Sequence, residues 1–192
     1  MSKKLIIFGS DKISNFYEKK IYKQKDIIIA RDNSTNVRRV FKLLIKRSLS
    51  ISTLIKMSFA ELLRKKIKNK SKVIKVKNNK EILSICEKEN VNKIILFRCG
   101  LIIKPNLFNS KIQIINVHCA DLPSYAGLGT IDKALRNNHL EQNVCAHIVN
   151  KDIDTGKVLY KMKYFLDPKK TYMENEDFAY KTGYKLLIKH LI

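Results

Sequence analysis

Residues 91–118 read VNKIILFRCGLIIKPNLFNSKIQIINVH and contain two short apolar runs, at 91–97 and 111–118. Continuous apolar runs of this length are typical of strands buried in a parallel sheet. A turn or short helix beginning at Pro105 and Asn106 separates them. This stretch therefore predicts two neighbouring core strands.

The same alternation continues toward the amino terminus. We expect a strand at each apolar run and a helix between them, the first helix being capped by Asp11 or Ser14. Helical spacing of leucine, isoleucine and valine predicts one long helix or two broken helices over 37–68. The expected strands are 3–9, 26–30 and 72–76, and a further amphipathic helix covers 79–88.

Toward the carboxyl terminus, a helix is expected over about 130–137 and two strands over 144–149 and 158–165. The strands are separated by the turn signal Asp154-Thr155-Gly156, which favours an antiparallel hairpin at one edge of the sheet. The Thr-x-x-Glu pattern of Thr171 and Glu174 predicts a capping box that opens a last helix. We expect Phe178, Leu186 and Leu187 to face inward on it.

Strands that alternate with helices predict an α/β fold. We expect a Rossmann-like, mostly parallel sheet with helices on both faces and the antiparallel hairpin at its edge. The chain has 192 residues, of which 45% are hydrophobic. That length and apolar content predict one domain, spanning 1–192, and exclude a disordered chain.

The chain is strongly basic, with a formal net charge of +22, and residues 1–96 hold 25 of its 39 Lys and Arg residues. The densest run, RKKIKNKSKVIKVK at 64–77, could attract a nucleic acid, a nucleotide or an anionic membrane. No nucleic-acid motif accompanies it, and lysine is abundant throughout. We therefore favour a solvated basic surface, and we do not expect a nucleic-acid partner.

The four cysteines, Cys86, Cys99, Cys119 and Cys145, form no C-x-x-C pair and are expected to be reduced, mostly buried thiols. No apolar run is long enough for a signal-peptide core or a membrane span. We expect a cytoplasmic protein with no membrane partner and no metal site, and a homodimer is compatible with the sequence.

Asn116 and His118 stand at the carboxyl end of a predicted strand, where open α/β sheets bind ligands. Side chains two positions apart share one face of a strand, so an amide and an imidazole should enter the same cleft. An Asn-x-His pair alone would equally suit two residues that bond loop backbone.

A longer pattern decides between these interpretations. It runs Asn116-Val117-His118, Leu122-Pro123, Tyr125, Gly127, Ala146-His147-x-Val149 and Asp154-Thr155-Gly156. This ordered run resembles the formyltransferase family that uses 10-formyltetrahydrofolate, whose signature is N-x-H-x-x-x-L-P-x-Y-x-G followed by a D-x-G turn. The resemblance implies transfer of a formyl group to a primary amine.

The implied catalytic residues are Asn116, His118 and Asp154. Attack of an amine on a formyl carbon creates an oxyanion, to which Asn116 and His118 can donate. We expect Asp154 to keep His118 charged at neutral pH and, with water, to help move the amine proton. Asp152 is a rival carboxylate on the same loop. A calcium loop is disfavoured because Lys161 stands where its last acidic ligand belongs.

Two other pairings carry less weight. Cys119 and His118 face opposite sides of a strand, and Cys145 with His147 is more simply a packed thiol and a hydrogen-bonded imidazole. By resemblance, the folate ring lies against two loops. Their residues here are Cys99, Gly100, Leu101 and Ile102, together with Asp152 and Ile153.

The resemblance leaves the amine acceptor open among three classes. The loop FGSDKISNF has fewer glycines than the phosphate loop of glycinamide ribonucleotide formyltransferases, and the chain has no room for the second domain of methionyl-tRNA formyltransferases. We therefore expect a nucleotide-linked amino sugar used for polysaccharides, with glycinamide ribonucleotide as the alternative. Departures at Cys119, Ala126 and Cys145 concern the acceptor side. A non-catalytic basic binding module is the alternative from another class.

Overall fold

The computed structural model describes residues 3–21, 24–34, 45, 49–67, 73–108 and 111–192. Its strands are β1 Lys3–Phe8, β2 Ile27–Asp32, β3 Ile74–Val76, β4 Val91–Phe97, β5 Gln113–His118, β6 Glu141–Ile148 and β7 Val158–Phe165. Its helices are α1 Lys12–Ile21, α3 Ile51–Leu63, α4 Asn79–Glu89, α5 Pro105–Phe108, α6 Thr130–Arg136 and α7 Tyr172–His190.

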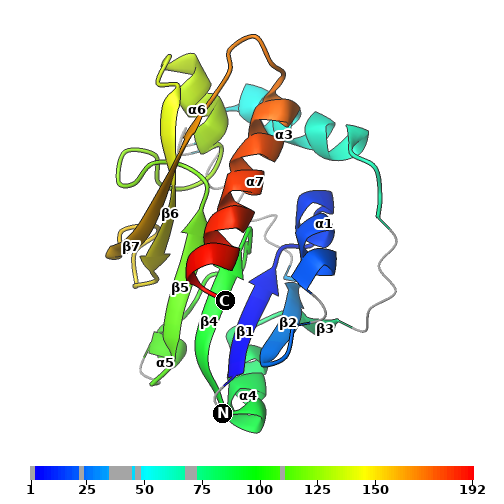
Figure 1. The fold of residues 1–192 in the computed structure, drawn as a ribbon, viewed down its shortest axis with the longest axis vertical. Helices are drawn as coiled ribbons and strands as arrows, with labels where there is room; N and C mark the ends of the chain where they lie inside the picture. Colours follow the sequence, from blue (N-terminus) through cyan, green and yellow to red (C-terminus); the bar gives the residue numbers. More distant parts are fainter. Residues whose placement is uncertain (1–2, 22–23, 35–44, 46–48, 68–72, 109–110) are drawn as a thin grey trace.

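The strands form one sheet in the order β3-β2-β1-β4-β5-β6-β7 (Figure 1). Neighbours from β3 to β5 are parallel, whereas β6 pairs antiparallel with both β5 and β7. The predicted Rossmann-like α/β sheet with an antiparallel edge hairpin is therefore confirmed. The order reverses beside β1, since the chain leaves it first toward β2 and returns to β4 on its other side.

Helices cover both faces of the sheet because the inner strands are apolar on both sides. On β1, Ile6 and Phe8 belong to one buried cluster and Leu5 and Ile7 to the other. α1 and α7 pack on the first cluster, and α4 and α5 pack on the second. Each such buried side chain contributes roughly 1.5–3 kcal/mol of transfer free energy.

The last helix begins as predicted, with a complete capping box between Thr171 and Glu174. Leu186 and Leu187 are fully buried, but Phe178 is 48% exposed, so the prediction that it faces inward is wrong. The inward line of α7 passes instead through Ala179 and Gly183, and a Cβ at Gly183 would lie 2.8 Å from the Cys119 sulfur. Phe178 flanks that line.

The helix predicted over 37–68 is present as α3, which begins after the N-cap Ser50. Residues 35–44 and 46–48 lie outside the described residues, so the question of one or two helices is not decided. Ile55, Leu62 and Leu63 point outward and are 54–73% exposed. The inward face of α3 is polar instead, because Thr53, Lys56 and Arg64 form hydrogen bonds or ion pairs with α6 or α7.

Two further sequence expectations concern caps and thiols. Asp11, rather than Ser14, caps α1, since its Oδ1 accepts from the Ser14 amide at 2.8 Å. Cys86, Cys119 and Cys145 are buried and Cys99 is half-buried, and all four are free thiols. Within the described residues, no helix is both long and apolar enough to span a bilayer.

Candidate active site

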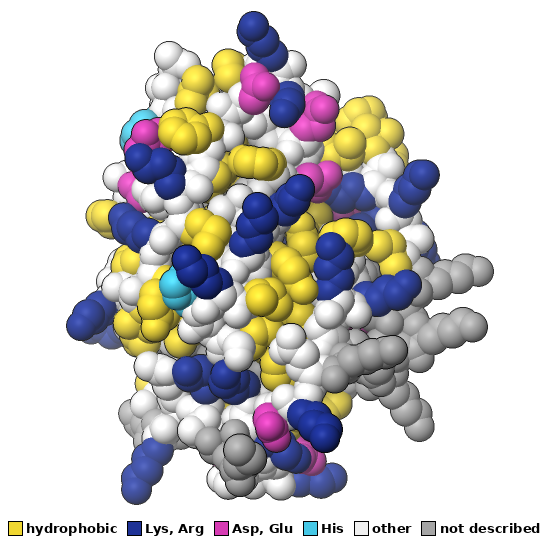
Figure 2. All heavy atoms as spheres, viewed as in Figure 1, with side chains coloured by type: hydrophobic (Ala, Val, Ile, Leu, Met, Phe, Trp, Pro, Cys, Tyr) yellow, Lys and Arg dark blue, Asp and Glu magenta, His cyan; other side chains and the backbone are white. Residues whose placement is uncertain are grey.

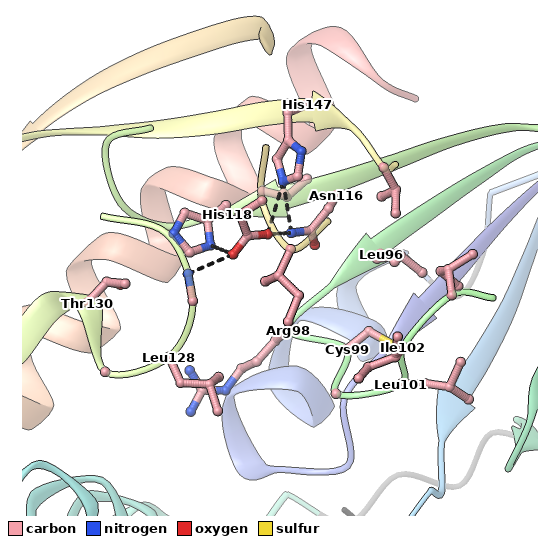
Figure 3. A pocket seen from close by; sticks show the side chains of 18 of the residues that line it. Leu96, Arg98, Cys99, Leu101, Ile102, Asn116, His118, Leu128, Thr130 and His147 are labelled. Carbon is pink, nitrogen blue, oxygen red and sulfur yellow. Dashed lines mark hydrogen bonds and ion pairs between the residues drawn. The ribbon is translucent and has the colours of Figure 1, made fainter. Parts of the chain in front are cut away.

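Asn116 and His118 lie at the carboxyl end of β5 and line one pocket with a volume of about 350 Å³. Pairing with β6 places His147 opposite Asn116 and Cys145 opposite His118. The β6 strand therefore adds a second histidine to the predicted pair. Figure 3 shows His147 above Asn116, with His118 beside them.

Asp154 reaches this cluster through the tight turn between β6 and β7. Its backbone is left-handed, with φ of 56°, and a Cβ at Gly156 would collide with the carbonyl oxygen of Ile148. Only glycine fits so close to the neighbouring backbone. The Asp-x-Gly pattern thus folds the turn back so that the Asp154 side chain points toward β5.

The Asp154 carboxylate is surrounded by donors. Oδ2 accepts from the Gly127 amide at 2.9 Å, and Oδ1 accepts from Asn116 Nδ2 at 3.2 Å. Burial raises the pKa of Asp154. The hydrogen bond with His147, the nearby His118 and the Gly127 amide lower it by more, so that the pKa is about 2. Asp154 is therefore ionised at neutral pH. Asp152, the rival carboxylate, is exposed on the loop.

His118 has a protein partner on each ring nitrogen. Nε2 donates to the backbone carbonyl of Tyr125 at 2.6 Å, and Nδ1 lies 3.5 Å from Asp154 Oδ2. Burial lowers the pKa of His118 and outweighs the opposite effects of Asp154 and the Tyr125 carbonyl. This burial, with the residue 9% exposed, opposes the expectation that Asp154 keeps His118 charged at neutral pH, whereas the acceptor beside each ring nitrogen favours the charged ring.

His147 is the site residue that sequence reasoning missed. Its Nε2 lies 3.1 Å from Asn116 Nδ2 and 3.3 Å from Asp154 Oδ1, while Nδ1 donates to the Ile148 carbonyl at 3.0 Å. In the neutral ring, Nε2 accepts from Asn116; with a proton on Nε2, it donates to Asp154. Its place in the run Ala146-His147-x-Val149 was a sequence signal, but only the antiparallel register sets it against Asn116.

The six residues expected to hold the folate line the same pocket as Asn116, His118 and Asp154. Part of their backbone is already engaged, because the Gly100 amide donates to Asp32 Oδ2 at 2.8 Å and the Ile102 carbonyl accepts from Asn79 at 2.9 Å. Ile102 and Ile153 are about half exposed. These loops therefore offer apolar side chains to a ring more readily than Gly100 offers its amide.

Arg98 also lines the pocket and was not anticipated from the sequence. Its guanidinium bonds Asp11 Oδ2 at 2.6 Å and Glu176 Oε1 at 2.9 Å, and its carbon Cζ lies 4.4 Å from the centre of the Tyr180 ring. Two carboxylates thus neutralise the cation that projects into the pocket (Figure 3).

The basic run at 64–77 divides into different environments. Arg64 is 8% exposed and pairs with Glu176 at 2.7 Å and Asp177 at 2.8 Å, whereas Lys65 and Lys66 are exposed. Residues 68–72 lie outside the described residues. On the face shown in Figure 2, Lys and Arg side chains are spread among apolar ones rather than gathered in one patch.

Comparison with known proteins assigns the chain to a protein family. A methionyl-tRNA formyltransferase from Synechococcus sp. (strain JA-3-3Ab) is 27% identical over 119 residues, which is 62% of this chain and 37% of the relative. One from Finegoldia magna is 34% identical over 91 residues, 47% of this chain and 29% of the relative. This chain thus matches less than two fifths of the length of these relatives.

Two solved structures share the fold. A sugar N-formyltransferase from Shewanella sp. matches with a TM-score of 0.65 and 15% identity, covering 98% of this chain and 68% of that chain. A phosphoribosylglycinamide formyltransferase from Bacillus halodurans matches with a TM-score of 0.59 and 16% identity, covering 97% and 96%. The formyl transferase family model matches residues 3–191. The chain therefore belongs to the formyl transferase family.

Proposed function

We propose that this protein is an N-formyltransferase that moves the formyl group of 10-formyltetrahydrofolate to the primary amine of a nucleotide-linked amino sugar. The observation that carries the proposal is that the Asp154 carboxylate lies within 3.5 Å of both Asn116 and His118, at the wall of the pocket. A carboxylate, an amide and an imidazole at one point can accept a proton and stabilise negative charge.

In the proposed reaction, a bond forms between the amine nitrogen and the formyl carbon, and the bond from that carbon to the folate nitrogen breaks. Negative charge develops on the formyl oxygen during attack, and we assign Asn116 Nδ2 as its side-chain donor. Both of its protons point at present partners, His147 Nε2 and Asp154 Oδ1. One of these contacts must be exchanged for the formyl oxygen.

His147 supplies a way to make that exchange. A proton taken up from water on its Nε2, and returned to water after the formyl group has moved, turns the ring from an acceptor for Asn116 into a donor for Asp154, 3.3 Å away. Asn116 is then released to donate to the formyl oxygen. The proton lost by the amine is passed by Asp154, through water, to the folate nitrogen that leaves.

We place the folate ring against the apolar walls of the pocket. Ile102 and Ile153 come from the two loops on which we place the ring, and both are about half exposed at the pocket. Apolar side chains on either face of a flat ring are the usual lining of a small-molecule site. Because the Gly100 amide already donates to Asp32, other polar groups of these loops must form the hydrogen bonds with the edge of the folate ring.

The choice of acceptor rests on charge. The amino-terminal half holds 25 of the 39 Lys and Arg residues, which suits the two phosphates of a nucleotide sugar. Among the structures that share this fold, the Shewanella protein is described as a sugar N-formyltransferase. Glycinamide ribonucleotide is the alternative acceptor.

A panel assay tests the proposal. The protein is incubated with 10-formyltetrahydrofolate and, separately, with a nucleotide-linked amino sugar, glycinamide ribonucleotide or methionyl-tRNA, and formylated products are identified by mass spectrometry. We expect product from the sugar, and none from the same reaction with Asn116→Ala. Formylation of glycinamide ribonucleotide alone would overturn the acceptor, whereas no product from any acceptor would overturn the assigned site.

A further inference from the structure

The start of α1 faces the pocket at the point where the strand order reverses. Asp11 lines the pocket next to Arg98, and α1 follows β1 after the short turn at Gly9 and Ser10. In open α/β sheets, a helix that begins at this point is a general binding place for phosphate, because its first amides are unpaired and its dipole is positive. An amine substrate that carries phosphate would ordinarily place it here.

Carboxylates of the chain itself already occupy this position. The Lys12 amide donates to Glu61 Oε1 at 2.9 Å, and the Ser14 amide donates to Asp11 Oδ1 at 2.8 Å. The nearest guanidinium, on Arg98, is bonded to Asp11 and Glu176. The amides and the guanidinium that would contact a phosphate therefore already have carboxylates of the chain as partners.

Contacts at the carboxyl end of α3 hold Glu61 beside the start of α1. Lys12 Nζ donates to the carbonyls of Leu62 and Arg64, at 2.9 and 2.7 Å, so α1 and α3 cap each other. Arg64 ties the same end of α3 to Glu176 and Asp177 on α7.

The other end of α3 is anchored on α6. Asp132, which is 1% exposed, accepts from Thr53 Oγ1 and Lys56 Nζ, each at 2.6 Å. Hydrogen bonds and ion pairs thus hold both ends of α3, and this places the Glu61 carboxylate at the start of α1.

We propose that Glu61 is a specificity-determining residue that fills the anion position at the start of α1 and so excludes a substrate phosphate from it. The inference rests on the proposed function and narrows it: phosphates of the acceptor bind outside the first turn, which disfavours small sugar-phosphate amines. Burial and the neighbouring Asp11 raise the pKa of Glu61. The same neighbour would repel a phosphate placed there.

Inorganic phosphate is the probe, and the backbone amides of residues 9–14 are the readout by ¹H–¹⁵N NMR at fixed ionic strength. In the wild-type protein we expect no saturable shift of these amides. In Glu61→Ala, and to a lesser degree in Glu61→Gln, we expect saturable shifts with a dissociation constant at least about tenfold below the highest phosphate concentration used, because the carboxylate no longer competes for the Lys12 amide. Glu87→Gln, on the exposed side of α4, is the matched control and should behave like wild type.

Saturable phosphate binding by the wild type as tight as by the variants would overturn the proposal, as would no gain in either variant. Glu61→Gln keeps an acceptor for the Lys12 amide, so it decides the question if Glu61→Ala does not fold. The titration contains neither folate nor amine. Its outcome is therefore independent of whether the acceptor panel supports formyl transfer to a sugar.

Discussion

Asn116 Nδ2 lies 3.1 Å from Nε2 of His147, its partner across the antiparallel pair of β5 and β6. The contact joins two residues 31 positions apart and directs the amide at the carboxylate of Asp154. It makes the site a four-residue cluster in which each polar group limits what its neighbours can donate or accept.

Asn116→Ala and His118→Ala should each lower turnover by about 100-fold or more, because the first removes the donor assigned to the developing oxyanion and the second removes the imidazole beside Asp154. Steady-state kinetics with the acceptor identified by the panel provides the measurement. Asn92→Ala, on the exposed start of β4, is the matched control. Turnover near wild type in either site variant would reject the site.

The two substitutions should differ in stability. His118 is buried and donates to the Tyr125 carbonyl, so its removal leaves a buried acceptor unsatisfied and should cost about 1–3 kcal/mol of unfolding free energy. Asn116 is only half-buried, so Asn116→Ala should lower the unfolding free energy by less. Urea unfolding of both variants measures the difference, and an equal loss would contradict the burial argument.

His147→Ala should lower turnover by about tenfold while leaving the KM for folate nearly unchanged. The ring positions Asn116 and Asp154 but stands behind them, so its loss misdirects the amide without removing it. Turnover and KM measured across pH separate this positioning role from a general loss of structure. His190→Gln on α7, outside the pocket, is the control, and a His147→Ala profile identical to wild type would exclude the role.

Asp154 should make the fold sensitive to acid. Its pKa in the fold is about 2, below the ordinary 3.8, so its charge stabilises the fold above about pH 4 and that contribution is lost as pH falls toward 2. The contribution is on the order of 2 kcal/mol. Denaturant unfolding between pH 2 and 5 should show a shallower decline in Asp154→Asn than in wild type. Asp152→Asn, on the same loop, should follow the wild-type curve.

The exposed lysines of the basic run at 64–77 should matter for encounter with the acceptor and not for chemistry. Replacing Lys65, Lys66, Lys75 and Lys77 by glutamine should weaken the apparent affinity for an anionic acceptor at low salt and leave turnover within about twofold. Kinetics at two salt concentrations test this, and a collapse of turnover at unchanged affinity would refute it.

Arg64→Gln should instead destabilise the protein by about 3 kcal/mol, because it leaves the buried Glu176 with one partner fewer.

The strand and helix pattern and the directions of Asn116 and His118 could be predicted because they depend on local periodicity. Side chains two apart on a strand share a face whatever surrounds them, and the Asp-x-Gly turn brings Asp154 back because only glycine fits against Ile148. The capping box at Thr171 is equally local. These features required no knowledge of distant residues.

Contacts between remote segments were decided only by the tertiary structure. His147 meets Asn116 through strand register, and Glu61 reaches the start of α1 across 49 positions because α3 is held at both ends. The outward apolar face of α3 escaped prediction because helical spacing fixes which residues share a face, while ion pairs with α6 and α7 decide which face turns inward. The charge of His118 likewise depends on burial, which removes water from the imidazole and so disfavours its protonated form.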